Sequence, residues 1–164
     1  LIPFWEKTST PKALINIRDD SIKDKKWAHK YIQFQRCLIP ASGFYEWKKE
    51  GKQKQPFYIR RPDEQPFAFA GLWEQWQDTR SCTILTTAPN ELMKPLHDRM
   101  PVILSPNDYD FWLNSEKNEP ASLGYLYEPF PENELIATPV STVVNNAKHE
   151  GPDCIEGPAK DSLF

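Results

Sequence analysis

Glu46 and His97 are the residues of this sequence whose types and surroundings best suit proton transfer. Glu46 stands within Gly43-Phe44-Tyr45-Glu46-Trp47, where apolar surroundings favour the protonated carboxyl, as a general acid or base requires. His97 is followed by Asp98-Arg99 in a loop expected between a helical turn and a strand, and such loops often display catalytic groups. The alternatives are an edge-strand glutamate that faces solvent and a histidine with a structural role only.

A second group of candidates lies near the start of the chain. Asn16 and Arg18 are two positions apart and would share one face of an extended segment, presenting an amide and a guanidinium to a phosphate. Both side chains could instead bond only to backbone groups. Phe4 and Trp5 lie among basic residues, a combination typical of single-stranded nucleic acid binding by stacking, although aromatic residues also pack in cores.

The formal net charge of −3 conceals an uneven distribution of charge along the 164 residues. Residues 1–61 contain fourteen Lys or Arg and six Asp or Glu, a net charge of +8. Residues 62–164 contain six and seventeen, a net charge of −11. This asymmetry indicates that a polyanion binds at one face of the molecule. The alternative is that a basic and an acidic surface merely offset each other in net charge.

The three cysteines form no C-x-x-C pair, so the sequence indicates neither a disulfide framework nor a zinc site, and no metal or cofactor is expected. Cys37 and Cys82 each begin an apolar run and are expected to behave as small buried hydrophobes. Reduced thiols and the absence of a leader indicate a cytoplasmic protein. No apolar run approaches the roughly 18 residues of a membrane span, so no membrane association is expected.

Short apolar segments bounded by proline, glycine and polar turns predict the elements that position these residues. A helix is expected after Asp20-Ser21, a helical turn at 90–93, and a second helix with Ser105 as its cap and Pro106 at its first position. The expected strands are 34–40, 44–47, 56–60, 67–73, 82–87, 101–104 and 139–145. This pattern predicts an α+β fold, with a mostly antiparallel sheet or distorted β-barrel and a few short peripheral helices.

Several short motifs follow one another in the order of a known family. The chain closely resembles the SOS response-associated peptidase (SRAP) family, the abasic-site-processing proteins, from Leu1 to about Glu156. The resemblance therefore indicates a single SRAP domain over residues 1–164. The motifs that carry it are Ile15–Arg18, Cys37–Lys48, Phe69–Glu74, Ile84–Thr87, His97–Leu104, Pro139–Thr142 and Val144–Asn146.

The resemblance implies a protein that binds single-stranded DNA and captures abasic sites covalently. In the family, the α-amine and the thiol of an N-terminal cysteine close a thiazolidine with the ring-opened sugar, and the associated peptidase activity removes the initiator Met. By motif match, Asn16 would orient that cysteine and the sugar, and Glu46 and His97 would transfer protons. Arg18 and Arg99 would contact phosphates. Phe4 and Trp5 would stack on or beside a base.

Two departures from the family pattern bear on this expectation. The Asn-Ala-Arg pattern of the family is Asn16-Ile17-Arg18 here, and Asp19-Asp20 follows, which places acids beside the expected phosphate site. The sequence also begins at Leu1-Ile2-Pro3, as though inside a domain, without the segment that carries the cysteine. None of the three cysteines has a free α-amine, so the sequence as it stands is expected to be inactive in crosslinking.

Three functional hypotheses follow. The first is an abasic-site-crosslinking SRAP protein, expected to be a monomer whose partner is single-stranded DNA containing abasic sites. The second is a non-catalytic module that binds single-stranded DNA. The third, less favoured, is a cysteine peptidase that acts on other proteins and pairs Cys37 with His97.

Overall fold

The computed structural model describes residues 1–7, 12–24, 26–51, 53–114 and 119–158. Its backbone forms two compact units, each built from three stretches of chain that alternate along the sequence. The first unit comprises residues 1–41, 67–88 and 99–130. The second comprises residues 42–66, 89–98 and 131 onward. Each unit has its own sheet.

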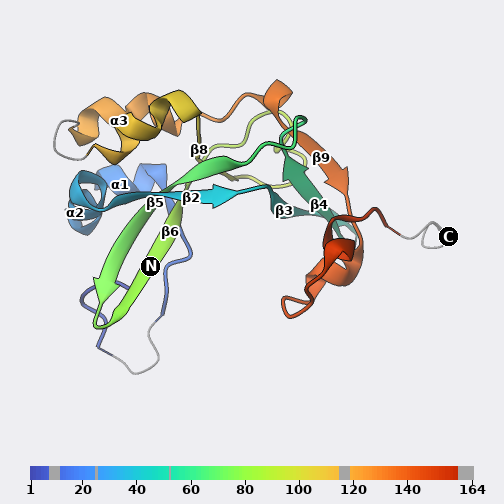
Figure 1. Ribbon diagram of the computed structural model, residues 1–164, viewed down its shortest axis with the longest axis horizontal. Helices are drawn as coiled ribbons and strands as arrows, with labels where there is room; N and C mark the ends of the chain where they lie inside the picture. The colour runs from blue at the N-terminus through green and yellow to red at the C-terminus, as the bar shows by residue number, and fades with distance from the viewer. Residues whose placement is uncertain (8–11, 25, 52, 115–118, 159–164) are drawn as a thin grey trace. The chain divides into compact units, whose positions relative to one another are not determined.

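The sheet of the first unit is mixed. Its strands in spatial order are β1 (Asn16–Arg18), β6 (Thr79–Thr87), β5 (Phe67–Trp76) and β2 (Arg36–Ala41), with β7 (Met100–Pro101) beside β6 and β8 (Ile103–Leu104) beside β5. The β1–β6 pair is parallel, and the other pairs are antiparallel. Figure 1 shows the long β5–β6 hairpin of this sheet. Its two-residue turn places Gln77 at a φ of 49°, a conformation that suits a tight hairpin.

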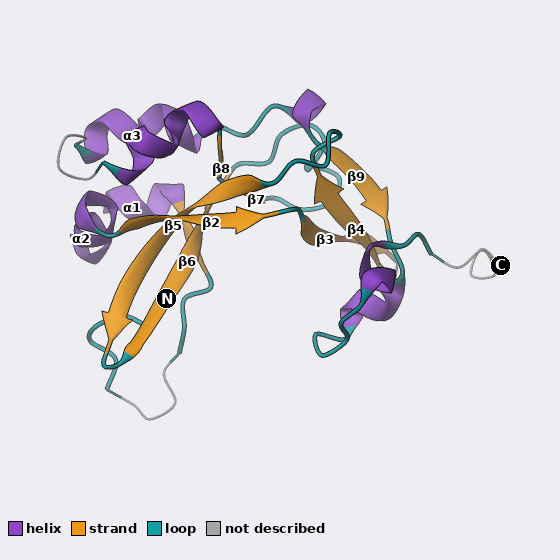
Figure 2. Ribbon diagram, in the orientation of Figure 1, coloured by secondary structure: helices purple, strands orange, loops and turns teal. Residues whose placement is uncertain are grey.

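Short helices cover the apolar side of this sheet and complete a core. Figure 2 shows them as α1 (Asp19–Asp24), α2 (Lys26–Phe34) and α3 (Tyr109–Leu113), with the 3-10 helix Pro120–Tyr127 near them. Their apolar side chains meet those of the strands in one cluster. Fully buried members include Tyr31, Ile32, Leu72, Leu85, Leu104 and Trp112. Burial of these large side chains is the main stabilising contribution to the first unit.

A buried arginine binds the C-terminal ends of two of these helices. Arg36 donates from Nη1 to the carbonyl of Ile32 in α2, at 2.6 Å, and from Nε to the carbonyl of Trp112 in α3. Carbonyls in the last turn of a helix have no partner within the helix, and the helix dipole favours a cation there. One guanidinium therefore satisfies two helix ends inside the core.

The second unit is built on a three-stranded antiparallel sheet in the order β3 (Phe44–Glu50), β4 (Gln53–Arg60), β9 (Ile136–Pro139). The β3–β4 hairpin turns at Gly51, whose φ of 63° suits glycine. Two 3-10 helices, Thr142–Asn145 and Pro152–Ile155, follow β9, and Ile59, Met93 and Val140 are fully buried. β3 forms an outer edge of this sheet, which matters for the site described below.

The structure confirms the α+β fold with mostly antiparallel pairing and short helices. The expected last strand at 139–145 is wrong, because β9 ends at Pro139 and a 3-10 helix occupies Thr142–Asn145. Cys82, in β6, is exposed rather than buried. Ser105 holds the cap position, as expected, but its hydroxyl makes no capping hydrogen bond. Among the described residues, no helix is both long and apolar enough to cross a membrane.

Candidate functional site

A cleft of about 920 Å³ opens beside β3 of the second unit. Because β3 is an edge strand, a cleft along it can take side chains from both faces of the strand. The residues that line it come from β3, β4, the 94–98 segment and the end of the 3-10 helix at 142–145. They are Glu46, Trp47, Lys49, Lys54, Lys94, Pro95, Leu96, His97, Asp98 and Asn145.

Glu46 lies at the middle of β3, opposite Phe57 of β4, and its carboxyl faces the cleft. Burial raises the pKa of Glu46, and this effect exceeds the opposing attraction of His97 and a hydrogen bond from the backbone of Trp47. The sequence left open a carboxyl in apolar surroundings or a glutamate on an edge strand. Glu46 combines the two, because β3 is an edge strand and the carboxyl is nevertheless partly desolvated. A carboxyl whose pKa is raised holds its proton more readily than an ordinary glutamate, which suits a general acid.

His97 reaches the same cleft from a compact series of turns. Asn90 starts the series, its side-chain oxygen accepting from the backbone N–H of Met93 at 2.9 Å, and the buried Met93 side chain anchors it. The backbone N–H of His97 donates to the carbonyl of Met93 at 2.9 Å, which fixes the end of the series. The His97 ring is 48% exposed, with Nδ1 3.2 Å from a carboxylate oxygen of Asp98. The imidazole is thus accessible to a ligand in the cleft and lies within ion-pair distance of a carboxylate.

Three of the residues that line the cleft are lysines. Lys49 and Lys54 stand directly opposite each other in the β3–β4 ladder, so their side chains lie on one face of the hairpin. Like charges in directly opposed positions destabilise an antiparallel pair. Lys94 lines the cleft as well, and its ammonium is paired with the carboxylate of Glu91. An anionic ligand in the cleft would relieve this repulsion.

An aromatic ring with a fixed orientation lies next to these lysines. The indole N–H of Trp47 donates to the side-chain oxygen of Asn145 at 2.7 Å. The ring centroid of Trp47 also lies 6.4 Å from that of Tyr45. A held ring beside ammonium groups is the arrangement with which proteins stack bases and bind the backbone of single-stranded nucleic acids.

The other candidates belong to the first unit. Asn16 and Arg18 both project outward from β1, on either side of the buried Ile17. The Arg18 guanidinium is bound by Asp20, with Nη2 2.6 Å from Oδ2. Asp20 thus accepts hydrogen bonds from the guanidinium of Arg18, the group that was expected to contact a phosphate.

Arg99 is less accessible than Arg18. Its side chain is 18% exposed, and Nη2 lies 2.5 Å from Oδ1 of Asp19 and donates to the carbonyl of Thr86 as well. Thr86 is the ladder partner of Arg18, so both arginines lie at the same end of the β1–β6 pair. Each of the two is held by an acid of the Asp19-Asp20 pair.

Phe4 and Trp5 form an exposed aromatic surface, 55% and 43% accessible. Their rings pack edge to face with centroids 5.0 Å apart, and Trp5 packs against Trp27 at 5.5 Å. The ammonium of Lys30 lies 4.8 Å from the centre of the Phe4 ring. The surface therefore combines accessible rings with a cation.

Comparison with known proteins assigns the chain to a family. The family model described as SOS response associated peptidase (SRAP) matches residues 1–147. This chain belongs to the SRAP family. The match spans stretches of both compact units, so the SRAP pattern is not confined to either one.

Named SRAP relatives and solved structures agree with this assignment. The chain is 40% identical to the abasic site processing protein YoqW of Bacillus subtilis, over 95% of this chain and 73% of YoqW. It is 32% identical to the abasic site processing protein YedK of Escherichia coli, over 93% and 69% of the two chains. A crystal structure of a protein from Bacteroides thetaiotaomicron matches with a TM-score of 0.82 and 29% identity, over 96% of this chain and 73% of that one.

The SRAP residues singled out in the sequence thus fall into two groups. Glu46 and His97 line one cleft of the second unit. Asn16, Arg18 and Arg99 lie in the first unit, around the β1–β6 pair. Their roles in an SRAP reaction stay predictions.

Sequence reasoning missed the basic side of the cleft. Lys49 and Lys54 are opposite each other only because the hairpin turns at Gly51, and this register is a signal that the sequence did contain. Asn145 belongs to the family motif Val144–Asn146, but it was not named as a site residue because its segment was expected to be a strand.

Cys37 does not have the properties of a peptidase nucleophile. Its thiol lies in β2, and burial raises its pKa to about 11. A thiol with that pKa stays protonated at neutral pH, whereas the thiolate is the nucleophile. The expectation of a Cys37–His97 peptidase therefore finds no support in this SRAP chain.

Proposed function

We propose that this protein processes abasic sites in single-stranded DNA by forming a covalent DNA–protein crosslink. Two observations support the proposal. The chain belongs to the SRAP family, and its relatives YoqW and YedK are named abasic site processing proteins. The cleft of the second unit also combines the proton-transfer pair Glu46 and His97 with three lysines. The cleft is the observation that carries the chemistry.

The reacting cysteine of this proposal precedes Leu1 in the complete protein. Its α-amine attacks the C1′ aldehyde of the ring-opened abasic sugar, and the adduct loses water to give an imine. The thiol then adds to the imine carbon and its proton passes to the nitrogen, which closes a thiazolidine. Asn16 orients the amine and the sugar, and the SRAP domain of this proposal comprises both compact units.

Glu46 and His97 divide the proton transfers of this sequence. Loss of water from the adduct needs an acid that protonates the departing hydroxyl, and Glu46, whose pKa burial raises, suits that role. Ring opening and imine formation also need a base for the protons of the sugar hydroxyl and the amine, and the exposed imidazole of His97 suits this one. The pair reaches one cleft from separate segments, so both can serve one bound sugar.

DNA affinity in this proposal comes from groups other than the abasic sugar, which is uncharged. Lys49, Lys54 and Lys94 would bind backbone phosphates, and Trp47 would stack on a base. In the first unit, Phe4 and Trp5 would stack on or beside a base, and Arg18 and Arg99 would contact phosphates.

The decisive experiment incubates the complete protein with single-stranded DNA that carries one abasic site. We expect a product that resists SDS. The rate of crosslinking should be at least about a hundredfold lower in Glu46→Gln or His97→Ala, because a general acid or base typically contributes at least that factor. Glu64→Gln is the matched control, because Glu64 is an exposed glutamate of the same unit, in an ion pair with Arg60. If the folded complete protein yields no SDS-resistant product, the proposal is wrong.

A non-catalytic single-stranded DNA-binding module is the second candidate. The opposed lysines of the cleft and the exposed aromatic surface favour it, since both serve binding without any covalent step. This candidate predicts salt-sensitive binding to intact and abasic strands with equal affinity, and no product after SDS.

A further inference from the structure

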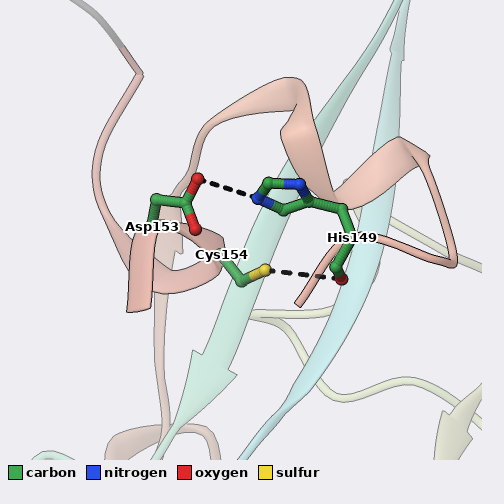
Figure 3. A group of neighbouring side chains, drawn as sticks. All are labelled: His149, Asp153 and Cys154. Carbon is green, nitrogen blue, oxygen red and sulfur yellow. Dashed lines mark hydrogen bonds and ion pairs between the residues drawn. The ribbon is translucent and has the colours of Figure 1, made fainter. Parts of the chain in front are cut away.

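Three side chains with different metal-binding atoms gather in the segment that follows β9 in the second unit. His149, Asp153 and Cys154 each offer one ligand atom, and these three atoms all lie within 4.8 Å of one another. Figure 3 shows the imidazole and the carboxylate joined by a hydrogen bond, with the thiol of Cys154 beside them. The group has no part in the cleft or in the proposed crosslinking reaction, so another role has to account for it.

The distances suit a tetrahedral cation. With bonds of about 2.0 to 2.3 Å, the ligand atoms of a tetrahedral zinc ion lie roughly 3.3 to 3.6 Å apart. Here Nε2 of His149 and Oδ2 of Asp153 are 2.8 Å apart, and the widest separation in the group is no more than 4.8 Å. Shifts of about 1 Å, within the reach of side-chain rotation, would convert this arrangement into a zinc site.

The backbone holds the three residues in place before any ion binds. The phenol of Tyr45 on β3 donates to the carbonyl of Cys154 at 3.2 Å, and the N–H of Cys154 donates to the carbonyl of Gly151 at 3.2 Å. The N–H of His149 donates to the carbonyl of Asn146 at 2.9 Å. These bonds tie the loop to the sheet and to its own turns, so little ordering remains to oppose binding.

The donor set selects the kind of ion. Ca²⁺ and Mg²⁺ prefer sites made of oxygen ligands, whereas one thiolate and one imidazole suit Zn²⁺. A disulfide does not explain Cys154, which is a free thiol, as are Cys37 and Cys82 of the other unit. Without an ion, the ring of His149 bonds to Asp153 and the Cys154 thiol donates to the carbonyl of His149 at 3.9 Å, so all three ligand atoms already lie on the same side of the loop.

We propose that His149, Asp153 and Cys154 bind a zinc ion, with water as the fourth ligand. On binding, the Cys154 thiol loses its proton to solvent, neutral His149 donates through Nε2, and Asp153 exchanges its hydrogen bond for the metal. The ion would link the loop at His149 to the 3-10 helix Pro152–Ile155 and fasten the end of the described chain.

The test uses the reduced full-length protein and Co²⁺ as a spectroscopic substitute for Zn²⁺. We expect a thiolate-to-cobalt charge-transfer band and the intense visible bands of tetrahedral Co²⁺, both abolished by one equivalent of Zn²⁺. His149→Ala and Cys154→Ser should each weaken Co²⁺ binding at least about tenfold, the lower end of what loss of an outer-shell partner alone costs. Cys154→Ser should also remove the charge-transfer band.

The matched control is Cys82→Ser, because Cys82 is an exposed free thiol of the other unit. This variant should keep both the band and the affinity. No band in the wild-type protein, or a band that survives in Cys154→Ser, would overturn the proposal. Circular dichroism confirms that each variant is folded, and because the readout involves no DNA, its outcome is independent of the crosslinking assay.

Discussion

The guanidinium of Arg18 is held by the carboxylate of Asp20, with Nη2 2.6 Å from Oδ2 and Nε 3.2 Å from both oxygens. The hydrogen bonds from Arg18 are the main reason why the pKa of Asp20 is lowered. A carboxylate bound in this way occupies the same donors that would bind a phosphate. A DNA phosphate at Arg18 must therefore displace Asp20.

Replacing this carboxylate should strengthen DNA binding. We expect Asp20→Asn to raise the affinity for single-stranded DNA about two- to fivefold at low salt, in keeping with the small contribution of exposed ion pairs. The plot of log affinity against log salt should become steeper by about 0.7, the increment for one further phosphate contact on a single strand. Fluorescence anisotropy at several salt concentrations measures both quantities.

Asp63→Asn is the control for this prediction. Arg61 binds Asp63 at the same two-residue spacing, with contacts of 2.9 and 2.7 Å, but has no proposed part in DNA binding. Equal gains in the two variants would mean that the change in net charge, rather than Arg18, strengthens binding.

The raised pKa of Glu46 should appear as pH-dependent stability. Between the usual value of 4.5 and the raised value, the unfolded protein binds fewer protons at this position than the folded protein does. The folded state therefore loses stability as pH rises through this window and regains it below 4.5. Glu46→Gln removes the effect, so its Tm advantage over the wild type should grow as pH rises from about 4 to 7. A Tm difference that stays constant over this range would show that burial of Glu46 is not felt in solution.

Arg36 should be one of the most sensitive positions for stability. Arg36→Met keeps the apolar stem but leaves the carbonyls of Ile32 and Trp112 without their buried donor. We expect a loss of about 2 to 4 kcal/mol in the free energy of unfolding, measured by urea titration, from two unsatisfied acceptors. Arg80→Met is the control, because Arg80 is exposed and its change should cost less than about 0.5 kcal/mol.

Gly43 should not tolerate a methyl group. A Cβ there would lie 2.3 Å from the ring of Tyr58 and 2.6 Å from the carbonyl oxygen of Ile59, and the backbone atom cannot move cheaply. Gly43→Ala should cost about 1 to 3 kcal/mol in thermal or urea unfolding, as overpacking does. Gly124→Ala has open space around the new methyl and should leave the stability within about 1 kcal/mol of the wild type.

Local patterns in the sequence predicted most of the fold, because apolar runs and turn residues mark strands directly. The main error, at 139–145, has a local cause. The β-branched Val143 and Val144 favour a strand, but the Ser141 hydroxyl accepts from the N–H of Val143 at 3.4 Å and the Ser141 N–H donates to the carbonyl of Glu156. Such side-chain and backbone bonds compete with strand pairing, and here they prevail.

The candidate site was only partly predictable. Glu46 and His97 stand out because each is a titratable residue with unusual neighbours in the sequence. Such neighbours can be recognised within one short segment. The cross-strand pair of Lys49 and Lys54 follows from the register of a local hairpin and could have been predicted, whereas Asn145 reaches the cleft only through long-range folding. Proximity of this kind is a property of the folded chain rather than of any one segment.

The alternation of the two units along the chain constrains how the protein is made. Asn16 of β1 has its ladder partner at Ile84, so the first strand emerges from the ribosome long before β6 does. The first unit also needs residues 99–130, and the second needs residues beyond 131. Neither unit can therefore close during early synthesis, and the exposed apolar segments must await late, long-range contacts, which form slowly. Nascent chains of this protein are expected to depend on chaperones until the segment after residue 131 has been synthesised.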